Sequence, residues 1–84
     1  NKTIYDLLVE REGQVMSVGE FNSLIQSIFA QFNTVFLLQS DLYNVDPEET
    51  IDVVVWDDND MYTITLKIDD IIESTIEIVN VEVE

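Results

Sequence analysis

Apolar residues recur at helical spacing in the first part of the chain and alternate with polar residues in the last part. Thr3 followed by Asp6 is typical of a helix N-cap, and the pattern after it predicts a helix of about two turns that ends near Gly13. A capping box, Ser17 with Glu20, precedes a longer run of apolar residues at i, i+3, i+4 and i+7 spacing. These apolar residues are Val18, Phe21, Leu24, Ile25, Ile28, Phe29 and Phe32. We therefore expect an amphipathic helix over residues 18–32.

Beyond Asn33 the β-branched and aromatic content rises, which favours strands. The segment Val35–Gln39 predicts either a first strand or a continuation of the helix, and Asn44–Glu49 predicts a loop because it contains Pro47. Two alternating runs then flank the acidic turn 57–60, which predicts a hairpin. Ile51, Val53 and Val55 share one parity in the first run, and Tyr62, Ile64, Leu66 and Ile68 share one parity in the second.

A final strand is expected from about Thr75. Ile76 and Ile78 lie on one parity of this segment, and three valines lie on the other, which indicates a β-bulge or a change of buried face. These valines are Val79, Val81 and Val83. The predicted fold is α+β, with two N-terminal helices followed by a three- or four-stranded antiparallel meander sheet. Residues 1–84 are expected to form one domain, with the helix over 18–32 packed on one sheet face.

The distribution of charge suggests a class of partner. Fourteen of the 18 acidic residues lie in Asp41–Glu84, where Lys67 is the only basic residue, so this half carries a formal charge of −13 against −2 for residues 1–40. Such a field speeds encounter with a basic surface and repels nucleic acid and anionic membranes. We expect a binding protein that contacts neither nucleic acid nor membrane directly.

The missing residue types argue against catalysis. The chain has no Cys and no His, which removes thiolate chemistry, the usual neutral-pH base and the commonest zinc ligand. The turn 57–60 does not match a calcium loop, because a start at Asp57 places Met61 at the fifth position. No apolar run approaches the roughly 20 residues of a membrane span. We expect no enzyme activity, no cofactor and no metal, and a cytoplasmic location.

Carboxylates on a strand could imitate a nucleic-acid backbone. Residues on one strand face lie about 6.6 Å apart, roughly twice the axial rise per nucleotide, so such rows can occupy a groove that binds phosphates. Trp56 shares the parity of Asp52, which predicts either an exposed interface anchor or packing over Lys67 or Thr65. The expected partner contacts are Asp52, Asp57, Asp58, Asp60, Asp69, Asp70 and Glu73, with Trp56 and Tyr62 as apolar anchors.

One stretch resembles a known family. Residues 59–67, Asn-Asp-Met-Tyr-Thr-Ile-Thr-Leu-Lys, are similar to Asn-Asp-Met-x-Thr-Ile-Thr-Leu-Lys near the C-terminus of a prophage-encoded Cas9 inhibitor family of small acidic anti-CRISPR proteins. The resemblance covers nine of 84 positions, and the stretch belongs to a helical end in that family, whereas its period here predicts a strand. It implies a phage protein whose carboxylates engage the Arg and Lys residues that read duplex DNA. Asp57, Asp58 and Asp60 would be the counterparts of the acidic contacts.

The hypothesis from sequence is therefore a stoichiometric inhibitor from a phage or mobile element, acting in an infected bacterial host on a basic nucleic-acid-binding protein such as a CRISPR effector. Two alternatives stay open. One is an immunity or antitoxin-like protein that neutralises a basic nuclease toxin. The other is a virion structural component whose charge only maintains solubility and whose last strand, with Val79, Val81 and Val83, pairs with a second copy. A homodimer is compatible with each of them.

Overall fold

Two helices and a fully antiparallel sheet make up the part of the chain that the computed structural model describes, residues 2–32, 37–39, 50–57 and 60–84. This arrangement confirms the predicted α+β class. The elements in chain order are α1 (Ile4–Val9), β1 (Val15–Ser17), α2 (Val18–Gln31), β2 (Leu37–Gln39), β3 (Thr50–Trp56), β4 (Met61–Asp70) and β5 (Thr75–Val83).

Both helices begin where the sequence predicts. The Thr3 hydroxyl accepts from the Asp6 backbone N–H at 3.2 Å, and the Asp6 carboxylate accepts from the Thr3 N–H at 3.0 Å. Ser17 and Glu20 form the same reciprocal pair at the start of α2, at 3.1 and 3.2 Å. Each pair satisfies N–H groups that have no partner within the helix. The segment after α1 then turns at Gly13, whose φ of +86° is accessible to a residue without Cβ.

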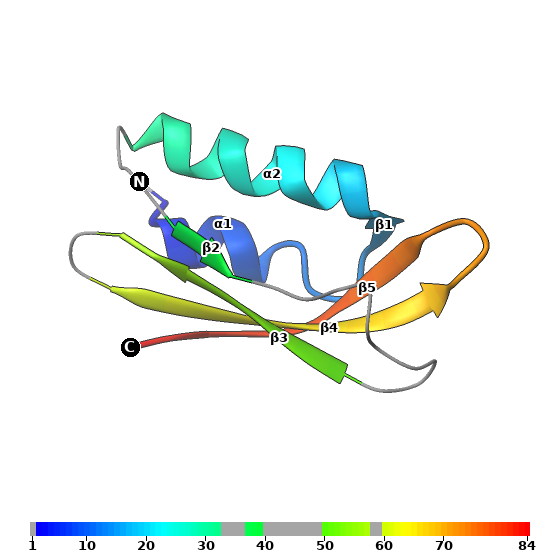
Figure 1. The fold of residues 1–84 in the computed structure, drawn as a ribbon. Helices are drawn as coiled ribbons and strands as arrows, with labels where there is room; N and C mark the ends of the chain where they lie inside the picture. The colour runs from blue at the N-terminus through cyan, green and yellow to red at the C-terminus, as the bar shows by residue number, and fades with distance from the viewer. Residues whose placement is uncertain (1, 33–36, 40–49, 58–59) are drawn as a thin grey trace.

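The sheet has the strand order β1-β5-β4-β3-β2 (Figure 1). Strands β2 to β5 follow one another as the predicted meander, and Leu37–Gln39 is a strand rather than a continuation of α2. The short strand β1 is an addition that the sequence did not predict. It pairs antiparallel with the start of β5, where Val15 lies opposite Glu77 and Ser17 lies opposite Thr75.

The expected irregularity in the last strand is a β-bulge. Leu66 of β4 pairs with Ile78, whereas Thr65 pairs with Asn80, so Val79 is the extra residue on β5. The bulge reverses the parity of the strand, because Ile78 before it and Val81 after it are both buried. Val79 itself is exposed.

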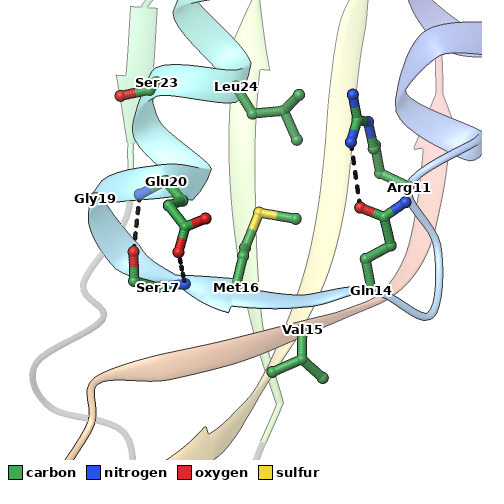
Figure 2. Close-up of a pocket in the computed structure, with 9 residues that line it drawn as sticks. All are labelled: Arg11, Gln14, Val15, Met16, Ser17, Gly19, Glu20, Ser23 and Leu24. Carbon is green, nitrogen blue, oxygen red and sulfur yellow. Dashed lines mark hydrogen bonds between the residues drawn. The ribbon is translucent and has the colours of Figure 1, made fainter.

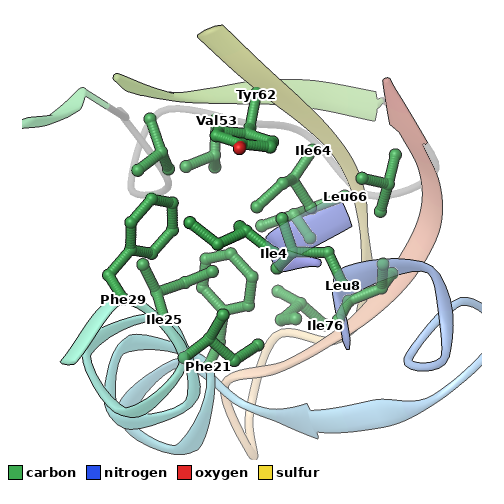
Figure 3. Close-up of a cluster of buried hydrophobic side chains, with 14 residues drawn as sticks. Ile4, Leu8, Phe21, Ile25, Phe29, Val53, Tyr62, Ile64, Leu66 and Ile76 are labelled. Carbon is green, nitrogen blue, oxygen red and sulfur yellow. The ribbon is translucent and has the colours of Figure 1, made fainter. Parts of the chain in front are cut away.

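The core lies on one face of the sheet, beneath both helices (Figure 3). Figure 3 shows side chains from α1, α2 and the sheet meeting in a single cluster, which includes Leu8, Phe21 and Ile64. This cluster includes, or has packed against it, every residue of the parity described above in β3 and β4, namely Ile51, Val53, Val55, Tyr62, Ile64, Leu66 and Ile68. None of the described helices is both long and apolar enough to span a bilayer.

Candidate acidic interaction surface

The sheet face opposite the helices, here called the outer face, carries acidic, other polar and apolar side chains. Residues on it alternate with the buried positions of β3, β4 and β5. They are Asp52, Val54, Trp56, Met61, Thr63, Thr65, Lys67, Glu77, Asn80 and Glu82. Hydrogen bonds from Thr65 Oγ1 to Asp52 at 2.9 Å and from Asn80 Nδ2 to Glu82 at 3.3 Å run between side chains of this face.

Most of the predicted contact residues lie at the two ends of the sheet. Asp57 and Asp60 lie at the turn between β3 and β4, next to Glu84, whose backbone N–H and C=O pair with Met61. The other predicted acidic residues, Asp69, Asp70 and Glu73, lie at the turn between β4 and β5. The two turns lie at opposite ends of the molecule in Figure 1.

The separation of these two ends follows from the length of β4. Asp60 precedes this strand and Asp70 ends it, so at about 3.3 Å per residue they lie roughly 30 Å apart. The predicted carboxylates therefore do not converge on one site. Asp52, Glu77 and Glu82 of the outer face lie between the two acidic ends, and the sequence analysis selected only the first of these three. Glu82 is exposed and Glu77 is partly buried, and the alternation that places both on this face was visible in the sequence.

Tyr62 is not the surface anchor that the sequence predicted. Its side chain is only 4% exposed, and its ring packs edge-on against Phe29 with 5.6 Å between ring centroids. Tyr62 shares the inward parity of Ile64 and Leu66, which is the physical reason for its burial. Its hydroxyl donates to Asp60 Oδ2 at 3.4 Å. Burial raises the pKa of this hydroxyl to about 12, with further contributions from the negative charges of Asp57 and Asp60.

Trp56 lies on the outer face, as its parity predicted, and is half-buried there. It lies opposite Met61 in the β3–β4 register, close to the acidic turn. Part of its side chain remains accessible at the end of β3. Asp58 lies outside the described residues.

A shallow groove of about 700 Å³ borders the start of α2 (Figure 2). Met16 and Leu24 point into it, and Arg11 lines one side, where its guanidinium donates to Gln14 Oε1 at 3.3 Å. Glu20 lines it as well, but its carboxylate is engaged in the α2 capping box. The groove was not predicted, because it depends on how β1 lies against α2. It contains no pair of groups arranged for acid–base or nucleophilic chemistry.

Among the described residues, no group of three or more His, Cys, Asp or Glu side chains could hold a metal ion. No protein-family model, curated protein or solved structure matches the chain. The stretch that resembles the anti-CRISPR family lies, in its described part 60–67, at the start of β4. It is therefore a strand, as its period predicted, and not a helical end. The resemblance stays a prediction.

Proposed function

We propose that this protein is an acidic stoichiometric inhibitor that occupies a basic nucleic-acid-binding surface of another protein. The observation that carries the proposal is a series of carboxylates along the long axis of the sheet, with acidic residues at both ends and three carboxylates of the outer face between them. It runs from Asp57, Asp60 and Glu84 at one end, through Glu82, Asp52 and Glu77, to Asp69, Asp70 and Glu73 at the other.

The dimensions of the molecule agree with this function. Its longest extent is 36 Å, close to the roughly 34–36 Å of one turn of B-DNA. A groove that binds one turn of duplex through Arg and Lys would therefore meet carboxylates along its whole length. Little positive charge offsets these carboxylates, because Lys67 is the only basic residue after position 40.

The mechanism is competition for the cationic groove. A carboxylate close to a guanidinium or ammonium group takes the place of a phosphate oxygen, so the partner cannot hold both the inhibitor and DNA. The resemblance to anti-CRISPR proteins favours a CRISPR effector in an infected bacterial cell as the partner. Because the attraction acts between solvent-exposed charges, binding should weaken strongly as salt rises.

A matched pair of variants tests the proposal. Glu82→Gln removes one charge from the outer face, and Glu10→Gln removes one from the helical side. Host proteins are captured on the wild-type chain at low salt, eluted with a salt gradient and identified by mass spectrometry. The eluted protein is then titrated with each variant in the presence of labelled duplex DNA.

We expect the captured protein to release its DNA as the wild-type chain is added. The outer-face variant should need several-fold more protein for the same release, while the helical-side variant should match the wild type. A captured partner that keeps its DNA, or equal effects of the two variants, would reject the proposal. Capture of a nuclease toxin encoded next to this chain would favour the immunity alternative.

A further inference from the structure

The turn between β4 and β5 exposes two adjacent isoleucines. Ile72 is 90% exposed and Ile71 is 59% exposed, more than any other large hydrophobic residue described. Turn positions favour Gly, Asn, Asp, Ser and Pro, which supply the required backbone angles or local hydrogen bonds. An isoleucine that remains in water adds little to folding stability. The fold itself therefore does not account for Ile71 and Ile72.

Hydrogen bonds hold the backbone of this turn in a defined position. Asp70 Oδ1 accepts hydrogen bonds from the backbone N–H groups of Ile72 at 2.9 Å and Glu73 at 3.3 Å. The Ser74 C=O accepts from the Val18 N–H at 3.1 Å, which ties the turn to the first residue of α2. A segment fixed in this way loses less conformational entropy when it binds a partner.

The charges beside the isoleucines define the partner. Asp69, Asp70 and Glu73 are all exposed next to the pair. A purely apolar surface would have to desolvate these carboxylates without compensation, and an anionic surface would repel them. A concave apolar site with Lys or Arg at its rim would bury the isoleucines and pair with the carboxylates at the same time.

We propose that the hairpin tip, consisting of Ile71 and Ile72 with Asp69, Asp70 and Glu73, inserts into an apolar pocket with a basic rim on a protein partner. This inference rests on the proposed function for the identity of that partner. It adds an apolar anchor at the end of the molecule opposite the Trp56 end. Ile71 and Ile72 fill the role for which the sequence analysis selected Tyr62.

Two synthetic peptides of equal charge serve as defined probes. One is Arg-Arg-Leu-Leu-Leu-Arg-Arg, and the other carries three glycines in place of the leucines. Binding is followed by methyl NMR, which reports Ile71 and Ile72 separately from the other apolar side chains. The test variant is Ile71→Ser with Ile72→Ser. The control is Val79→Ser with Val83→Ser, because these valines are also exposed, at 42% and 41%.

The wild type should bind the leucine peptide about tenfold more tightly than the glycine peptide, since burial of apolar surface strengthens association. The largest shifts should fall on the methyl groups of Ile71 and Ile72. The tip variant should lose the preference for leucine, and the control should keep it. Equal affinity of the wild type for both peptides, or shifts centred on Val79 and Val83, would overturn the proposal.

A charge variant tests the acidic half of the tip. The variant Asp69→Asn with Glu73→Gln removes two charges. The amide oxygen of Asn at position 69 can still accept the hydrogen bond that Thr75 Oγ1 donates to Asp69 Oδ2 at 3.2 Å. This variant should bind both peptides several-fold more weakly and still prefer the leucine peptide. Unchanged affinities would contradict the proposal that the partner's pocket has a basic rim. The peptide assay contains no nucleic-acid-binding protein. If the DNA-release test fails while the preference for the leucine peptide is retained, the proposed function is rejected and the proposal for the hairpin tip is not.

Discussion

Glu12 Oε1 accepts a hydrogen bond of 3.0 Å from the backbone N–H of Val81, across 69 positions of sequence. This N–H lies in the part of β5 that has no β1 partner, because β1 pairs only with Thr75–Glu77. A strand edge with unpaired N–H groups is a template for pairing with another chain. The Glu12 carboxylate both satisfies the donor and places a negative charge at that edge.

Replacing Glu12 with Ala should destabilise the fold and expose this edge. A partly buried N–H without its acceptor costs about 1–2 kcal/mol, so the free energy of unfolding should fall by about that amount in urea titrations. Light scattering should show more self-association than the wild type shows. Glu10→Ala is the control, because Glu10 forms a surface ion pair with Lys2, which contributes about 0–1 kcal/mol. Equal behaviour of the two variants would contradict this role of Glu12.

Replacing Ser17 with Ala should lower the free energy of unfolding by about 1 kcal/mol, because the Glu20 N–H loses its acceptor at the start of α2. Ser27→Ala provides the comparison, since Ser27 is exposed within the same helix and Ala has the higher helix propensity. Chemical denaturation of both variants is the measurement. A Ser17 variant as stable as the Ser27 variant would show that the cap contributes nothing.

Tyr62 should make the protein less stable at high pH. Its pKa is raised from 10.0 to about 12 in the folded state, so the folded protein retains the proton that the unfolded chain releases. Stability should therefore decrease as the pH rises from about 10 toward 12. Tyrosinate absorbance should show a late component in the wild type that Tyr62→Phe removes. If the variant keeps that component, the assignment to Tyr62 is wrong.

Salt should stabilise the isolated protein while it weakens binding to a basic partner. A net charge of −15 opposes the compact state, and raising ionic strength from about 0.01 M to about 0.15 M shortens the Debye length from about 30 to about 8 Å. The urea midpoint should rise over this range. It should rise less in Glu77→Gln with Glu82→Gln, which removes two of the repelling charges. A midpoint that falls with salt would show that favourable ion pairs outweigh the repulsion.

The helices and the central hairpin could be predicted because their signals are local. Ser17 and Glu20 lie three residues apart, and apolar residues recur at every second position through most of β3 and β4. The strand β1 could not be predicted, because three residues are too few to show a periodicity and because its pairing with Thr75–Glu77 is non-local. An irregularity in β5, either a bulge or a change of buried face, was predicted from the parity shift of its apolar residues, and the structure places a bulge at Val79.

The predicted contact surface was only partly placed by sequence. The composition indicated the acidic half, but an antiparallel meander puts consecutive turns at opposite sheet ends, which separates Asp60 from Asp70. Tyr62 was selected for its residue type although its parity already favoured burial. Ile71 and Ile72 were missed because the contact residues were selected mainly by their negative charge, and the turn at 71–74 exposes both isoleucines.

The pairing of β1 with the start of β5 also bears on folding during translation. The residues that complete this contact leave the ribosome only after β2, β3 and β4 have been synthesised. Because non-local contacts form only once both partners are present, the packing of the helices on the sheet stays incomplete until β5 emerges. Chaperone demand during synthesis should therefore be highest just before β5 appears, and a nascent chain stalled at that point is the form most open to proteolysis.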